Sequence, residues 1–361
     1  MNMKIKTQLK NIASFSKGEQ INGDDLLENG LYDYLNGGIY PSGKWDSYNT
    51  PANTVTISEG GNSCGYVNFM KKPFWCGAHC YYLFNTLSNT KYLYYVLKSQ
   101  QDRLMKIRSG ACMPNIKKSD LGSFEIVYET DEVEQKRIVE ILSKCENIIV
   151  SRKQQLAKLD ELVKARFVEM FASVEDEDTL INLCTFIDYR GKTPEKTESG
   201  LPFITAKNVK MHHMSFDTQE FISKETYDNV MTRGFPRIGD VVFTTEAPLG
   251  NVCRIPYIET EFYIGQRIIT MQTEQLEPAY LEYALSSDEF KRKIAEKSSG
   301  STVTGIRSKL LEQLTIPVPT RALQEQFATF VEQVDKSKVA VQKALDEAQT
   351  LFDSLMQQYF G

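Results

Sequence analysis

The chain has 361 residues and a formal net charge of −5, with 41% hydrophobic and 25% charged residues. This length predicts two or three domains with cores of their own, and the composition is typical of globular proteins. No run approaches the roughly 18 apolar residues of a membrane span, and Met1–Lys4 lacks the apolar stretch of a signal peptide. We therefore expect a cytoplasmic protein that does not contact membrane, with its seven cysteines reduced.

Residues 1–130 combine glycine-rich turns with short runs of β-type residues. Val55–Ile57 and Tyr81–Phe84 are typical of strands, while Asn36–Gly38 and Gly60–Asn62 are turn signals. The segment carries 14 Lys and Arg against 11 Asp and Glu, a balance of +3. We predict a first α+β domain here.

Residues 131–173 change abruptly to a helical pattern. Asp131–Phe171 contains neither glycine nor proline, and only Arg152 and Arg166 interrupt an apolar series at helical spacing. A helix of about 40 residues would be near 60 Å long at about 1.5 Å per residue. The apolar series consists of Leu142, Cys145, Ile149, Leu156, Leu159, Val163 and Met170.

Residues 174–320 predict a second α+β domain after an acidic linker, Glu175–Asp178. Pro202–Ile204, Asp240–Thr244 and Gln266–Ile269 are expected strands. The segment carries 16 Lys and Arg against 22 Asp and Glu, a balance of −6. Since a stand-alone nucleic-acid binder is usually basic, DNA binding by this chain would require local cationic clusters or partner subunits.

Residues 321–361 predict a second long helix. Its apolar stripe steps by threes and fours with only Lys338 interrupting. Because a wide apolar stripe is unstable in water, we expect the two long helices to pair as an antiparallel coiled coil. The alternative is that each helix packs on its own domain or drives homodimerisation. The stripe contains Phe327, Val331, Val334, Val341, Leu345, Ala348, Phe352, Leu355 and Tyr359.

The segment from Lys91 to about Arg166 recurs about 190 residues later. Gly110 corresponds to Gly300 and Leu121 to Leu311, and we align Glu134-Gln135 with Glu325-Gln326. A repeat of this length is a duplicated domain rather than a solenoid unit. It predicts two similar surfaces related by an approximate two-fold axis, which suits a target made of two parts.

The sequence favours a protein without a catalytic site. Gly38–Trp45 has phosphate-loop spacing, but tryptophan replaces the metal-binding Ser or Thr at its last position. A Rossmann glycine motif and an Asn-Pro-Pro-Tyr-type methyltransferase motif are both missing from the sequence, and the three histidines predict no triad. Cys64, Cys76, His79 and Cys80 fit buried thiols better than a zinc site. We expect no metal and no cofactor on this chain.

Loops that carry basic and amide side chains beside glycines, prolines or aromatics are the candidate DNA contacts. Such side chains bind phosphates or contact base edges, although each loop alone is more often a solvated surface. The candidates are Lys44, Tyr48, Lys71, Lys72 and His79 in the first domain, and Lys192, Lys207, Asn208, Gln266 and Arg267 in the second.

Several of these segments together resemble the DNA-specificity subunit of type I restriction-modification systems. Its central helical region resembles Glu134–Leu142 continued by Gln155–Phe167. Its target-recognition domains resemble Gly191–Pro194, Phe203–Val209 and Gly239–Thr244, with Ser58–Gly65 and Ala247–Gly250 as matching loops of the two halves. Its distal helical region resembles Ile316–Pro319 followed by Leu323–Phe327.

The resemblance implies recognition domains at 1–130 and 174–320, separated by helical spacers at 131–173 and 321–361. It implies that each domain binds one half of a bipartite double-stranded DNA target. It further implies that the helices dock two modification subunits, which bring S-adenosylmethionine and methylate adenine, and that a restriction or motor subunit joins them.

Two alternatives stay open on the sequence. The chain fits equally a system with a fused methylase-nuclease. It also fits a coiled-coil assembly scaffold whose globular domains bind protein, which the acidic second half favours.

Overall fold

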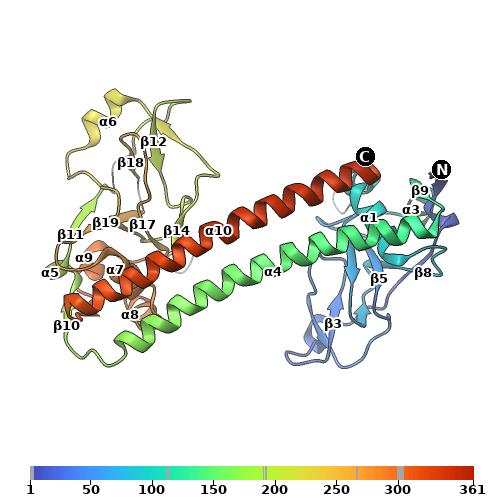
Figure 1. Ribbon diagram of the computed structural model, residues 1–361, viewed down its shortest axis with the longest axis horizontal. Helices are drawn as coiled ribbons and strands as arrows, with labels where there is room; N and C mark the ends of the chain where they lie inside the picture. Colours follow the sequence, from blue (N-terminus) through green and yellow to red (C-terminus); the bar gives the residue numbers. More distant parts are fainter. Residues whose placement is uncertain (1–3, 111–113, 190, 192, 266, 299–304) are drawn as a thin grey trace. The chain divides into compact units, whose positions relative to one another are not determined.

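The computed structural model describes residues 4–110, 114–189, 191, 193–265, 267–298 and 305–361. The chain divides into two compact units, the first formed by 1–153 with 342–361 and the second by 154–341. Two 40-residue helices, α4 (Glu132–Phe171) and α10 (Arg321–Phe360), each contribute one part to either unit (Figure 1). The predicted long helices are therefore present, and each unit is described by itself below.

The first unit is built on a four-stranded antiparallel sheet in the order β2-β8-β5-β6. A second sheet, β4-β3-β7, joins β3 to β7 in parallel, and β1 pairs with β9. The strands are β1 (Lys4–Gln8), β2 (Ser14–Lys17), β3 (Tyr32–Leu35), β4 (Gly43–Trp45), β5 (Thr54–Ser58), β6 (Val67–Met70), β7 (Phe74–Cys76), β8 (Cys80–Phe84) and β9 (Glu125–Glu129).

Helix α1 of the first unit packs on β5 and β6 of this sheet. Helix α1 begins at an Asn89 cap, whose side chain accepts hydrogen bonds from the amides of Lys91 and Tyr92. Its buried face adds Leu93 and Val96 to the core. The helices are η1 (Leu9–Asn11), η2 (Gly23–Asp25), α1 (Thr90–Ser99), α2 (Gln101–Lys106) and α3 (Lys118–Gly122).

The second unit repeats the same topology. Its sheets are β11-β19-β16-β17, β15-β12-β18 and β10-β20, with an additional hairpin, β13-β14. The strands are β10 (Glu177–Thr179), β11 (Thr185–Asp188), β12 (Leu201–Ile204), β13 (Val209–Lys210), β14 (His213–Met214), β15 (Phe221–Ile222), β16 (Val241–Thr244), β17 (Val252–Arg254), β18 (Tyr263–Ile264), β19 (Ile268–Gln272) and β20 (Thr315–Pro317). The helices are α5 (Leu180–Leu183), α6 (Lys224–Val230), α7 (Pro278–Ser286), α8 (Asp288–Lys297) and α9 (Ser308–Glu312).

The internal repeat is confirmed by matching strand order. In both units a parallel strand pair, β3-β7 or β12-β18, flanks a four-stranded antiparallel sheet of the same order. Leu121 in α3 and Leu311 in α9 are both fully buried, as the spacing of 190 predicts. Gly300, the predicted partner of Gly110, lies outside the described residues.

The predicted alignment of Glu134-Gln135 with Glu325-Gln326 is wrong. Gln135 accepts a hydrogen bond from the Asn89 amide and donates one to the Glu129 carbonyl. Gln324, and not Gln326, makes the equivalent bonds in the second unit. The two long helices therefore correspond at an offset of 189 positions, because the segment that leads into the second helix is one residue shorter.

The long helices contribute their apolar stripes to the core of each unit. In the first unit Leu142 of α4 and Phe352 of α10 belong to one cluster. In the second unit Phe167 of α4 lies 5.5 Å from Phe327 of α10, ring to ring. Lys338, which interrupts the predicted stripe, forms an ion pair with Asp160 of α4 at 2.6 Å.

Within the described ranges, no helix is both long enough and apolar enough to cross a bilayer.

Candidate nucleic-acid interface

Both units fold their loops in the same way at one end of the four-stranded sheet. After β5, the Ser58 amide donates to the Tyr66 carbonyl and the Gly65 amide to the Ser58 carbonyl, both at 2.9 Å. After β16, Thr244 exchanges the same bonds with Asn251 and Gly250 at 2.9 Å. The two loops that the sequence predicts to match, 58–65 and 247–250, therefore lie at equivalent positions. We call this end of each sheet its loop end.

His79 and Arg267 occupy the same position at the two loop ends. His79 directly precedes β8, and its carbonyl accepts from the Glu59 amide at 2.9 Å. Arg267 directly precedes β19, and its carbonyl accepts from the Thr245 amide at 2.8 Å. Both side chains are exposed. Two of the predicted DNA-contacting residues, His79 and Arg267, thus occupy equivalent positions in the two units.

A carboxylate orients each of these two side chains. His79 Nδ1 lies 3.2 Å from Glu59, which also binds Lys17 at 2.5 Å. Arg267 Nε lies 2.9 Å from Glu246. A carboxylate partner holds a long or rotatable side chain in one orientation, so both positions present an oriented hydrogen-bonding group.

The other first-unit candidates do not gather at the loop end. Tyr48 packs on Tyr32, at the opposite end of β3, with ring centroids 5.1 Å apart. Lys71 and Lys72 are exposed in the turn after β6, which runs away from the loop end. Lys44 is exposed in β4, just after the β3-β4 loop. Among the described residues, none of these three lysines has an ion-pair partner within 4.0 Å.

In the second unit the predicted candidates differ in their surroundings. Lys207 is exposed and lies 3.7 Å from Glu220. Asn208 is 4% exposed, and its amide accepts from the Thr205 amide and donates to two backbone carbonyls at 3.0 and 2.7 Å. A buried and fully hydrogen-bonded amide holds the shape of its loop, so we do not retain Asn208 as a DNA contact. Lys192 and Gln266 lie outside the described residues.

Sequence reasoning missed the tip of the β3-β4 loop. Ile39 and Tyr40 are exposed there, between β3 and the candidate Lys44. In the sequence this segment stands out only as an incomplete phosphate loop. The signal that points to the tip is an apolar pair directly after the Asn-Gly-Gly turn.

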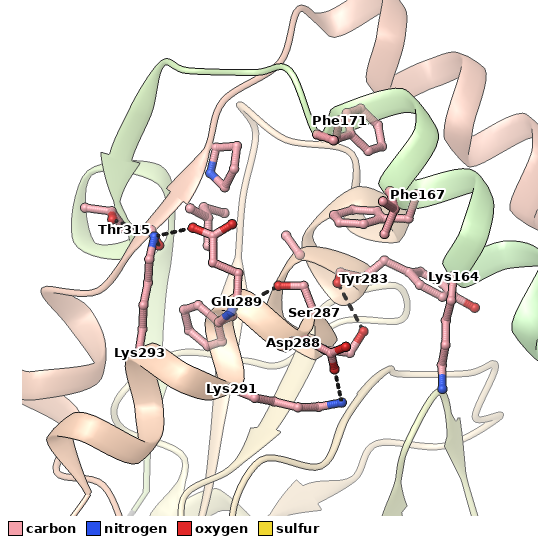
Figure 2. Close-up of a pocket in the computed structure, with 17 residues that line it drawn as sticks. Lys164, Phe167, Phe171, Tyr283, Ser287, Asp288, Glu289, Lys291, Lys293 and Thr315 are labelled. Carbon is pink, nitrogen blue, oxygen red and sulfur yellow. Dashed lines mark hydrogen bonds and ion pairs between the residues drawn. The ribbon is translucent and has the colours of Figure 1, made fainter.

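A pocket of about 400 Å³ lies in the second unit, beside the carboxyl end of α4 (Figure 2). Phe167 and Phe171 of α4 line it together with Tyr283. On its rim Lys291 faces Asp288 at 3.6 Å, and Lys293 faces Glu289 at 3.1 Å. Because these two cations are already paired over an aromatic floor, we do not assign phosphate binding to this pocket.

A family model described as the type I restriction modification DNA specificity domain matches residues 3–161 and again 180–348. These two matches cover most of the chain and follow the two copies of the fold. The chain therefore belongs to this family of type I specificity subunits, and the resemblance noted in the sequence is confirmed.

Individual relatives agree with this assignment. A predicted type I specificity subunit of Mycoplasma genitalium is 27% identical over 98% of this chain and 93% of its own length. The MjaVIII specificity subunit of Methanocaldococcus jannaschii is 23% identical over 72% of this chain and 68% of its length. The crystal structure of a type I S subunit from M. genitalium has the same fold, with a TM-score of 0.67 and 24% identity over 100% of this chain and 96% of that one.

Proposed function

We propose that this chain is the non-catalytic subunit that recognises DNA sequence for a type I restriction-modification complex. In this proposal its two α+β units are target-recognition domains, each binding one half of a bipartite double-stranded target. The equivalence of His79 and Arg267 carries the proposal. One scaffold position, built twice, presents two different hydrogen-bonding side chains, which is the arrangement expected for two different half-sites.

The long helices are proposed to act as an antiparallel coiled-coil spacer. Their contacts inside each unit support this role. In the second unit Phe171 of α4 lies 5.4 Å from Phe327 of α10, ring to ring, and the Lys338–Asp160 ion pair lies further along the same two helices. A stiff helical pair would convert its length into a fixed gap between half-sites, since DNA turns once per about 10 base pairs or 34 Å.

Two modification subunits are proposed to dock on these helices and to bring S-adenosylmethionine for adenine methylation. A restriction or motor subunit, separate or fused to the methylase, would join them. Exposed apolar side chains on both helices support a protein-docking role, because a soluble helix ordinarily turns such residues inward. They are Val133, Ile148, Val150, Leu162 and Val168 on α4, and Val339 and Leu351 on α10.

The scaffold alternative remains the second candidate, because residues 174–320 carry a balance of −6. A single experiment separates the two. The full chain, assembled with the modification subunits of its host, is used to select duplexes from a random pool. A recognition subunit enriches two short blocks separated by a constant gap, and a host carrying the chain methylates adenines in those blocks. Enrichment of no sequence would contradict the proposal and favour the scaffold.

A further inference from the structure

The β3-β4 loop of the first unit, residues 36–42, holds two apolar side chains in solvent. Tyr40 is 79% exposed and Ile39 is 42% exposed. Burial of apolar surface is favourable, and a loop with two adjacent glycines has the backbone freedom to turn its tip inward. The outward position of this tip therefore needs a physical cause.

Hydrogen bonds fix the backbone of this loop. The Gly37 carbonyl accepts from the Ser63 hydroxyl at 2.6 Å, and Asn68 Nδ2 donates to the Ile39 carbonyl at 3.2 Å. Gly37 adopts a φ of +83°, and a Cβ there would lie 2.4 Å from the His79 carbonyl oxygen. The loop is thus held backbone to backbone against the turn that carries His79, and its tip is kept outward.

A lysine and an imidazole flank the apolar tip. Lys44 follows the loop in β4, and His79 lies in the turn against which the loop packs. A duplex groove has the complementary pattern, since two phosphate strands border base edges that include the thymine methyl group. An apolar tip with a lysine on one side and a hydrogen-bonding imidazole on the other therefore fits a DNA groove, where phosphates border the base edges.

The second unit presents a different side chain from the equivalent loop. Leu35 ends β3 and accepts from the Gly77 amide, as Ile204 ends β12 and accepts from the Gly265 amide. Three residues beyond Ile204 stands the exposed Lys207. The corresponding residue of the first unit is Gly38, which the exposed Ile39 and Tyr40 follow, whereas Lys207 is followed by the buried Asn208 and Val209. The exposed apolar tip is therefore present in the first unit and not at the equivalent residues of the second.

We infer that Ile39 and Tyr40 form a rigid apolar loop tip, called the fingertip below, that inserts into the groove of one DNA half-site. There it makes the non-ionic contacts by which the first unit recognises its half-site. This inference rests on the proposed function. It assigns specificity to Tyr40, whereas Lys44, four residues further along the chain in β4, supplies charge.

The test measures binding of the selected duplex at several salt concentrations, with the full chain in its complex. We expect Tyr40→Ala to bind at least about tenfold more weakly, or about 1.4 kcal/mol, with an unchanged salt slope. Tyr40→Phe retains the apolar ring and should restore most of the affinity. Lys44→Ala should instead reduce the salt slope by about 1. The control is Leu87→Ala, because Leu87 is 71% exposed but follows β8 at the opposite end of the sheet.

Repeating the duplex selection gives the second readout. Tyr40→Ala should relax one or two adjacent positions in one half-site only. Wild-type affinity with an unchanged motif in Tyr40→Ala, or a loss matched by Leu87→Ala, would overturn the fingertip while leaving the proposed function intact. A wild-type complex that selects no motif would contradict the proposed function, and the fingertip with it.

Discussion

Gln135 and Gln324 make the same two backbone hydrogen bonds at the start of their respective long helices. Each side chain is 1% exposed. Each accepts from the residue that precedes a short helix, Asn89 or Glu277. Each donates to a backbone carbonyl, that of Glu129 at the end of β9 or that of Pro319 just beyond β20. One buried amide thus joins the strand, the short helix and the long helix in each unit.

Replacing either glutamine with alanine removes the partner of a part-buried backbone amide and of a buried carbonyl. We expect Gln135→Ala and Gln324→Ala each to lower the free energy of unfolding by about 1–3 kcal/mol per group left unpaired. Gln349→Ala is the control, since Gln349 is exposed on α10 and its side chain donates a hydrogen bond to Asp353 on the same exposed helix surface. Denaturant unfolding measures the difference, and equal losses in all three variants would contradict this assignment.

Arg254 of β17 links the sheet of the second unit to helix α10 through ion pairs. Its Nε contacts the buried Glu282 at 2.6 Å and its guanidinium contacts Asp335 of α10 at 3.0 Å. Burial lowers the pKa of Arg254, but these two carboxylates outweigh it and raise the pKa above its ordinary value. Glu146 of α4, which is 189 positions before Asp335, binds Lys91 in the first unit at 2.6 Å. An ion pair therefore joins each long helix to its own unit at an equivalent helix position, Glu146 in α4 and Asp335 in α10.

We expect Arg254→Met to destabilise the protein by about 3 kcal/mol, because Glu282 would keep a buried charge without its main partner. Asp335→Asn removes only the more exposed pair and should cost under about 1 kcal/mol. Thermal and denaturant unfolding of both variants check this order, and a larger loss for Asp335→Asn would refute it.

His79→Ala and Arg267→Ala should each alter a different half of the recognised sequence. Because each residue belongs to one unit, we expect the first substitution to relax one block of the selected motif and the second to relax the other. Loss of a well-placed base contact costs about 1–3 kcal/mol of discrimination. Duplex selection with each variant is the measurement. If one substitution relaxed both blocks, the assignment of one half-site to each unit would fail.

Burial raises the pKa of the Cys184 and Cys253 thiols to about 12. Because only the thiolate reacts readily, we expect both to resist alkylation in the folded protein at pH 8 and to react on unfolding. The folded state also binds these protons more tightly than the unfolded state. The two thiols thus make their full contribution to the free energy of unfolding below their ordinary pKa near 9. This contribution declines as the pH rises towards 12. Peptide mass spectrometry after alkylation checks the labelling, and fast labelling of the folded protein would contradict it.

Sequence reasoning succeeded where a local pattern decides the structure. Leu121 and Leu311 were correctly paired because both follow the same short apolar motif, and α4 and α10 were predicted from their periodicity. It failed where a remote backbone partner decides. Gln135 corresponds to Gln324 because each accepts a hydrogen bond from a backbone amide that is distant in the sequence, that of Asn89 or Glu277. The helical pattern of the sequence does not encode these bonds.

The candidate site shows the same limit. Asn208 has a side chain suited to adenine, but the Ser215 and Thr218 carbonyls occupy its amide. Tyr40 was missed because its exposure depends on bonds from Ser63 and Asn68, which lie in other strands and loops. Sequence-based prediction therefore found the loops that form the loop ends and could not rank the residues within them.

The most direct test of the account lengthens both long helices together. Seven residues inserted between Lys153 and Gln154 of α4, and seven between Val341 and Gln342 of α10, add about 10 Å to each helix at about 1.5 Å per residue. The methylated adenines of a host carrying this variant are then mapped by sequencing. We predict the same two half-sites with a gap longer by about three base pairs. The same half-sites with an unchanged gap would contradict it.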